Sequence, residues 1–163
     1  MRKDFYINIY NFVQRHNMGH FLKILNSAIT AAVFLFYPIL LVCLYFNRYA
    51  DILKMVFVPL CSFLLLTVFR TIINAPRPYE VFGTVPLTDG KKNGKSFPSR
   101  HTFSCFRIAL CCLHLNTLLG IAMLAAAAVL GMLRVVCGVH FIKDVIAAAI
   151  FAVLSYVIGF III

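Results

Sequence analysis

The chain has 163 residues, of which 63% are hydrophobic and 12% are charged, and 15 Lys and Arg residues against 5 Asp and Glu residues give a formal net charge of +10. Soluble domains are typically about 45–50% apolar and about 25% charged. This composition, with a mean hydropathy of +0.96, excludes a water-soluble globular protein. The sequence predicts an all-α membrane protein, a polytopic bundle of about five transmembrane helices.

The charged residues also narrow the chemistry and the partners. The five acidic residues are scattered along the chain, whereas two-metal hydrolysis needs carboxylates clustered around ions about 3.5–4 Å apart, so we expect no metal site. Most basic residues flank apolar segments, which favours anionic lipid head groups over nucleic acid as partners. The six cysteines lie in apolar segments without Cys-x-x-Cys spacing, and we expect free, buried thiols.

Residues 1–23 mix apolar side chains such as Phe12 with charged ones such as Lys23. This segment is too polar to span a membrane and lacks the compact apolar core and cleavage site of a signal peptide. It predicts an amphipathic helix lying in the membrane interface. We therefore divide the chain into this interfacial segment and a membrane-embedded domain, residues 24–163.

Five apolar segments follow the interfacial segment. The predicted spans are Ile24–Phe46, Ile52–Phe69, the two halves of Thr102–Gly138, and Val145–Ile163. As a single helix, Thr102–Gly138 would be about 55 Å long, which exceeds a hydrocarbon core of about 30 Å. We therefore predict a break between Asn116 and Gly120 that makes two tight spans.

The only long loop, residues 71–100, contains four of the six prolines and several lysines. Loops of this length in compact domains are usually lids, binding loops or disordered segments. Its run Gly90–Ser96 is similar to a phosphate-binding P-loop, but the spacing between its glycines is one residue short and no strand precedes it. We reject the P-loop interpretation for this reason.

With five spans, the ends of the second and fourth lie on the same side of the membrane as the starts of the third and fifth. Three clusters of polar residues meet there: Arg70 with Arg77-Pro78, then Pro98-Ser99-Arg100-His101, then Arg134 with His140 and Asp144. Arginine pairs grip phosphate bidentately, although Arg70 by itself is more simply explained as a side chain that snorkels from a helix end.

The other two clusters likewise have two interpretations. Ser99 suits a helix N-cap, where free N–H groups bind anions and His101 would act as a general acid; an ordinary capped helix is the alternative. If a helix begins near His140, Asp144 shares its face and fixes the imidazole tautomer, leaving the other nitrogen as a nucleophile. A structural pair of Arg134 and Asp144 is the alternative. Three separate coincidences would be needed to explain all clusters structurally, so they jointly indicate a phosphate site.

These clusters resemble the signature of the type 2 phosphatidic acid phosphatase superfamily, which shares its site with vanadium haloperoxidases. That signature reads Lys, six residues, Arg-Pro; then Pro-Ser-Gly-His; then Ser-Arg, five residues, His, three residues, Asp. Order, spacing and placement at span ends agree, and the resemblance covers roughly residues 24–163. The departures are Arg70 for lysine, Arg100 for glycine and Leu133 for serine. The arginine at position 100 puts the choice of substrate in question more than catalysis.

The resemblance implies a metal-independent, cofactor-free phosphatase that acts on a lipid phosphate. It implies that His140 attacks phosphorus, that Asp144 orients it, and that His101 protonates the leaving lipid oxygen. The phosphate-binding residues that it implies are Arg70, Arg77, Ser99, Arg100 and Arg134. Phosphatidylglycerophosphate, phosphatidate and undecaprenyl diphosphate are all compatible substrates.

Arg107 lies two helical turns beyond Arg100 on roughly the same face, where a charge is costly. We predict that it contacts the substrate head group; a snorkelling arginine is the alternative. The alternative function for the whole chain is a non-catalytic membrane protein that binds or passes anionic head groups, which would not need a carboxylate-oriented histidine. The sequence does not give the oligomeric state.

Two arguments about membrane orientation conflict. Placing the catalytic mouth and the N-terminus on one side leaves only Arg48 and Lys54 opposite, and the positive-inside rule would make the mouth cytoplasmic. The bacterial proteins that the chain resembles mostly present their site to the extracytoplasmic side. Following the resemblance, we predict a bacterial cell-membrane protein with an extracytoplasmic active site.

Overall fold

The computed structural model describes residues 3–47, 49–87 and 93–162. Lys91 and Lys92 of the predicted loop and Ile163 of the fifth predicted span lie outside these residues. All regular structure in the described ranges is helical, which confirms the predicted all-α bundle. The helices are α1 (Lys3–Arg15), α2 (Gly19–Phe46), α3 (Ile52–Ile73), α4 (Pro78–Phe82), α5 (Arg100–Leu115), α6 (Thr117–Val136), α7 (Ile142–Tyr156) and η1 (Val157–Ile162), a π-helical continuation of α7.

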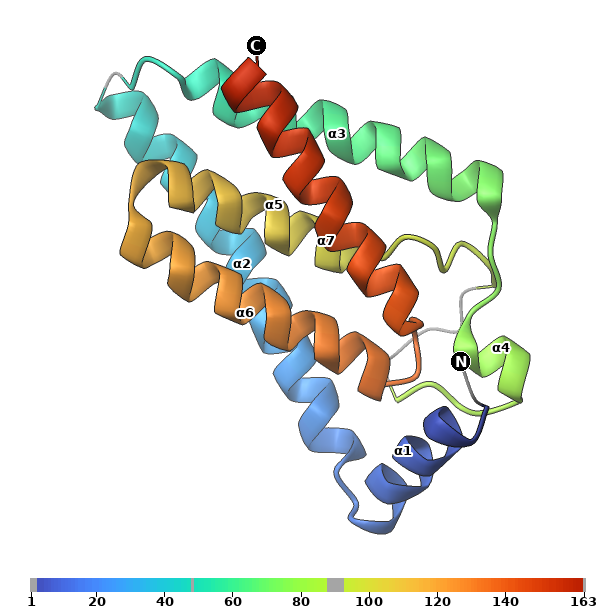
Figure 1. Ribbon diagram of the computed structural model, residues 1–163. Helices are drawn as coiled ribbons and strands as arrows, with labels where there is room; N and C mark the ends of the chain where they lie inside the picture. The colour runs from blue at the N-terminus through green and yellow to red at the C-terminus, as the bar shows by residue number, and fades with distance from the viewer. Residues whose placement is uncertain (1–2, 48, 88–92, 163) are drawn as a thin grey trace.

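The long helices pack side by side, and α1 and α4 lie at one end of the bundle (Figure 1). Helices α2, α3, α6 and α7 with η1 are long and apolar enough to cross a membrane. Their outer faces carry large apolar side chains such as Leu35, Leu65 and Leu118, which are 67%, 72% and 79% exposed. Such a surface would promote aggregation in water, whereas in a bilayer it contacts lipid. The chain is an integral membrane protein.

Helix α5 is the core of the bundle. It has 16 residues and is therefore about 24 Å long, shorter than a hydrocarbon core of about 30 Å. It packs against α2, α3, α6 and α7 (Figure 1), and most of its side chains are buried. The third predicted span is thus enclosed by the helices around it, and it is not among the four helices of the described residues that are long and apolar enough to cross a membrane.

The predicted break between the third and fourth spans falls at Asn116. This residue ends α5 and caps α6, and its Oδ1 accepts the N–H of Leu119 at 3.0 Å. A Cβ atom at Gly120 would lie 2.2 Å from the Cα of Leu113. Glycine is therefore needed where α6 turns back tightly along α5.

Two helix boundaries differ from the sequence prediction. Helix α2 begins at Gly19, so residues 19–23 belong to the first long helix and not to the interfacial segment; polar side chains near a helix end can extend to the interface and need not stop the helix. Helix α3 continues to Ile73, which places Arg70 inside its last turn, and Asn74 in a left-handed conformation (φ 43°) ends it.

Candidate active site

His140 and Asp144 meet at the junction of α6 and α7. His140 Nδ1 lies 3.5 Å from Asp144 Oδ2, and both side chains are buried, with exposures of 1% and 0%. The expectation that they share one helix face is wrong, because α7 begins at Ile142 and His140 lies in the preceding turn. Asp144 stands in the first turn, where its Oδ2 accepts the N–H of Phe141 at 3.0 Å. This capping contact fixes the carboxylate beside the histidine.

Ser96, which was not among the predicted site residues, contacts both members of this pair. Its hydroxyl donates to Asp144 Oδ2 at 2.5 Å and lies 3.4 Å from His140 Nδ1. The side chain is completely buried, and its backbone N–H donates to the carbonyl of Ala75. The Nδ1 side of the imidazole therefore faces a carboxylate and a hydroxyl, which places the proton on Nδ1 and the lone pair on Nε2.

The surroundings of His140 keep its imidazole neutral. Burial lowers the pKa of His140 to about 4; the hydrogen bond to Asp144 opposes this shift, and the positive charges of Arg134 and Arg77 add to it. At pH 7 the ring is therefore uncharged. A neutral imidazole with a fixed tautomer has the lone pair that a nucleophile requires.

Arg70 and Arg77 reach the site from either side of the end of α3. Arg70 donates to the carbonyls of Pro98 and Lys95, and Arg77 donates from Nε to the carbonyl of Gly94 at 3.0 Å. A guanidinium carries five N–H donors, so Arg70 keeps others for a ligand. With Lys95 and Arg100, both arginines line a cavity of about 160 Å³. This concentration of positive charge suits an anion.

Glu80 and Gly94, which the sequence analysis also missed, hold the loop that carries Arg77. The Glu80 carboxylate accepts the N–H of Arg77 at 2.6 Å and that of Gly94 at 3.0 Å. Gly94 has φ +63°, and a Cβ atom there would lie 2.3 Å from Asn74 Oδ1. A side chain at position 94 would therefore be strained, and the Asn74 side chain would have to move to make room for it.

Arg134 supports the turn that contains His140. Its carbonyl accepts the N–H groups of Val139 and His140, both at 3.2 Å, and its Nη1 donates to Asn26 Oδ1 on α2 at 3.4 Å. Its buried Nε has no hydrogen-bond partner within residues 3–47, 49–87 and 93–162. Arg134 thus brings a spare donor and a positive charge next to the histidine turn.

Ser99, Arg100 and His101 begin α5. Ser99 is the N-cap, as the sequence predicts, and its Oγ accepts the N–H of Thr102 at 3.5 Å; its own N–H donates to the carbonyl of Asp144 at 3.1 Å. This last hydrogen bond joins the start of α5 directly to the first turn of α7. The Arg100 guanidinium lies 5.9 Å from the ring centre of Phe63.

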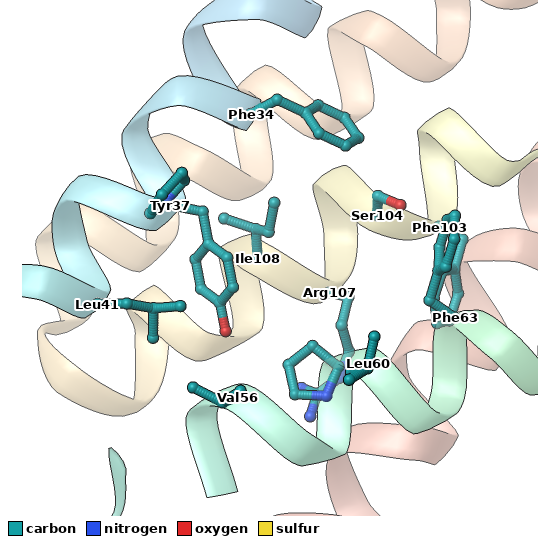
Figure 2. Close-up of a pocket in the computed structure, with 12 residues that line it drawn as sticks. Phe34, Tyr37, Leu41, Val56, Leu60, Phe63, Phe103, Ser104, Arg107 and Ile108 are labelled. Carbon is teal, nitrogen blue, oxygen red and sulfur yellow. The ribbon is translucent and has the colours of Figure 1, made fainter. Parts of the chain in front are cut away.

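The polar cavity at Arg70 is one of three neighbouring cavities. A second, of about 210 Å³, contains His101 and shares Arg100 with it. A third, of about 420 Å³, lies between α2, α3 and α5, and it shares Phe34, Phe63 and Ser104 with the second (Figure 2). The walls of the third cavity are almost entirely apolar. His101 thus lines a cavity that adjoins both the charged cavity and the apolar one.

Arg107 is not part of the charged cluster. It is buried in α5 and lines the apolar third cavity (Figure 2). The structure therefore separates it from Arg70, Arg77 and Arg100, which line the polar cavity.

Tyr6 on α1 contacts the turn between α6 and α7 from outside the bundle. Its hydroxyl oxygen accepts the N–H of Ile142, the first residue of α7, at 3.0 Å. Its ring packs edge-on against Phe141, with centroids 5.4 Å apart, and lies 5.6 Å from Phe82. The N-terminal helix therefore braces the segment that carries His140 and Asp144.

Comparison with known proteins gives the family of the chain. No curated protein has a matching sequence. The fold is similar to the crystal structure of Aquifex aeolicus LpxE, with a TM-score of 0.76 and 24% identity over 96% of this chain and 92% of that one. It is also similar to a transmembrane PAP2-type phosphatidylglycerolphosphate phosphatase from Bacillus subtilis, with a TM-score of 0.63 and 21% identity over 95% of this chain and 90% of that one.

At these identities the two structures establish a shared fold. The sequence profile of the PAP2 superfamily matches residues 51–163, the part of the chain that contains all three signature clusters. The resemblance seen in the sequence is confirmed, and the chain belongs to the PAP2 superfamily.

Proposed function

We propose that this protein is a lipid phosphate phosphatase that hydrolyses a phosphomonoester or diphosphate through a phosphohistidine at His140. The observation that supports this most is the neutral, oriented imidazole beside a cluster of arginines. Anion binding alone needs the arginines but has no use for a histidine whose pKa is depressed and whose Nδ1 faces a carboxylate.

In the first step, Nε2 of His140 attacks phosphorus, and the bond from phosphorus to the lipid oxygen breaks as the nitrogen–phosphorus bond forms. The imidazole becomes positively charged, and the Asp144 carboxylate beside Nδ1 stabilises that charge. Arg70, Arg77, Arg100 and Arg134 hold the phosphate oxygens together with the Ser99 hydroxyl. Phosphoryl transfer depends mainly on positioning and charge stabilisation, which such a set supplies.

His101 protonates the leaving lipid oxygen in this mechanism. Its position between the charged and the apolar cavities supports the role, because the oxygen to be protonated joins the phosphate to the apolar part of the substrate. In the second step, water attacks the phosphohistidine, His101 takes a proton from that water, and the nitrogen–phosphorus bond breaks. Inorganic phosphate leaves and both histidines are regenerated.

The same series of cavities supports a lipid as the substrate. Phosphatidylglycerophosphate, phosphatidate and undecaprenyl diphosphate each combine a phosphate with a long apolar part. We propose a substrate from this group, bound with its phosphate among the arginines and its apolar part between α2 and α3.

The test is phosphate release by the purified protein in detergent, with excess chelator, on each of these three lipids. His140→Ala removes the nucleophile, and His16→Ala, an exposed histidine after α1, is the matched control. Release that survives the chelator and His16→Ala but is lost in His140→Ala supports the proposal. Loss of release on chelation contradicts the metal-independent mechanism. A folded protein that binds these lipids and releases no phosphate would instead be a binding protein.

We further propose that the active site faces the extracytoplasmic side of a bacterial cell membrane. Thr84 follows α4 at the active-site end, whereas Asn47 follows α2 at the other end (Figure 1). Thr84→Cys and Asn47→Cys, in a background without the two exposed cysteines Cys43 and Cys61, would be treated with a membrane-impermeant thiol reagent on intact cells. We expect labelling at position 84 alone. Labelling at position 47 alone would mean that the active site faces the cytoplasm.

A further inference from the structure

Arg107 is a buried cation whose hydrogen-bond donors have no partner among the described residues. Its exposure is 1%, and Nε, Nη1 and Nη2 all lack an acceptor in the described part of the chain. The guanidinium carbon lies 5.7 Å from the ring centre of Tyr156 and 5.1 Å from that of Phe160. These rings attract the charge, but they supply no oxygen to the N–H groups.

A charge buried without hydrogen bonds is strongly destabilising, and about nine in ten buried polar groups in proteins have a partner. The nearby Tyr37 hydroxyl donates its proton to the carbonyl of Met55 at 2.5 Å, and its oxygen does not remove the difficulty, because none of the three guanidinium nitrogens makes a hydrogen bond to it. An acceptor for Arg107 must therefore come from a molecule that enters the cavity it lines.

That cavity determines what kind of molecule can enter. Figure 2 shows the Arg107 side chain extending from α5 toward α3, along the edge of a space bounded by Phe34, Leu60 and Ile108. Phe34, Phe63 and Ser104 also line the neighbouring cavity that contains His101. A lipid with its phosphate at the arginine cluster would extend its apolar part past Arg107.

We propose that Arg107 donates hydrogen bonds to an ester carbonyl oxygen of the bound lipid, so that the enzyme selects acylated lipid phosphates over polyprenyl ones. This inference rests on the proposed function and narrows it, because a polyprenyl chain carries no oxygen. Ester carbonyls are the acceptors that an acylated lipid brings into an apolar cavity. A charge-assisted hydrogen bond to such an oxygen is strengthened where water is excluded.

The test compares two lipids that differ only in those oxygens: dioleoyl phosphatidate, with two ester carbonyls, and the dialkyl ether phosphatidate of equal chain length. Two quantities are measured for each lipid in detergent: phosphate release, as kcat/KM, and the increase in the protein's melting temperature on binding. The wild type is expected to prefer the ester lipid about tenfold or more in kcat/KM, the size of one hydrogen bond to a charged group. A wild-type ratio near one overturns the proposal without any variant.

Arg107→Met is expected to reduce the ester-to-ether ratio to about one, mainly by raising KM for the ester lipid. Arg107→Lys, which keeps a charge and donors, is expected to restore part of the ratio. Cys105→Ala is the control for disturbance of α5, because Cys105 is buried in the same helix and does not line the cavity; its ratio should equal that of the wild type. An unchanged ratio in Arg107→Met overturns the proposal.

The two measurements separate this inference from the proposed function. If the ester lipid raises the melting temperature more than the ether lipid does, and only when Arg107 is present, the carbonyl site stands even when no phosphate is released. If phosphate is released from both lipids equally, the phosphatase stands and the carbonyl site does not. If neither lipid binds or is hydrolysed, the carbonyl site is wrong, and phosphate release from phosphatidylglycerophosphate and undecaprenyl diphosphate decides whether the phosphatase stands.

Discussion

The Ser96 hydroxyl donates to Asp144 Oδ2 at 2.5 Å, although the two residues are 48 positions apart in the chain. The same hydroxyl lies 3.4 Å from His140 Nδ1. The loop before α5 is thereby bonded to the carboxylate that orients the proposed nucleophile. The orientation of His140 depends on this loop as well as on the first turn of α7.

Ser96→Ala should therefore lower kcat by about tenfold to a hundredfold, in line with the loss of a group that orients a ligating or reacting side chain. KM should change little, because Ser96 is completely buried and does not line the polar cavity. Steady-state phosphate release measures both parameters. Ser155→Ala is the control, since the Ser155 hydroxyl donates to the carbonyl of Ala152 within its own helix. Equal losses in both variants would contradict the orienting role.

The depressed pKa of His140 predicts how the rate depends on pH. Because the folded-state pKa is about 4, the imidazole stays neutral as the pH falls from 7 to about 5. Protonation, which removes the attacking lone pair, occurs only at lower pH. The acid limb of kcat/KM for the purified protein should accordingly have its midpoint well below 6.5. A midpoint at or above 6.5 would mean that burial does not control this histidine.

Tyr6→Phe removes the hydroxyl that accepts the N–H of Ile142 and keeps the ring between Phe141 and Phe82. We expect kcat to fall several-fold with little change in KM, because the first turn of α7 loses a brace while the phosphate-binding side chains stay in place. The matched control is Tyr10→Phe on the same helix. Activity on a short-chain, water-soluble lipid phosphate distinguishes this effect from altered membrane contact of α1, since only a brace acts on a soluble substrate.

Gly94→Ala tests the loop that carries Arg77. The new Cβ would combine a left-handed backbone (φ +63°) with a 2.3 Å approach to Asn74 Oδ1, whereas Gly83→Ala has a similar φ of +67° and nothing within 4 Å. Gly83→Ala should cost about 1 kcal/mol in the free energy of unfolding, the usual penalty for this conformation. Gly94→Ala should cost more and should also raise KM. Equal melting temperatures for the two variants would show that the contact with Asn74 relaxes freely.

The sequence was sufficient for the membrane bundle and for most of the site. Apolar length marks the spans through bilayer thickness, and the number of spans places their polar ends on one side. The three clusters keep their spacing because each lies within a few residues of a helix end, where position in the chain and position in space agree. Arg70, Ser99, His140 and Asp144 were selected as candidates in this way, and the resemblance of their motifs to the PAP2 superfamily is confirmed.

Only the tertiary structure decided which contacts hold the residues of these clusters in position. Ser96, Asn26 and Tyr6 act on residues 48, 108 and 136 positions away, and nothing local distinguishes them from other polar residues near helix ends. The central position of α5 could not be predicted from its apolar length, because contacts with four neighbouring helices set that position. The neutral state of His140 likewise depends on complete burial and on the arginines packed around it, which arise only when distant segments of the chain fold together.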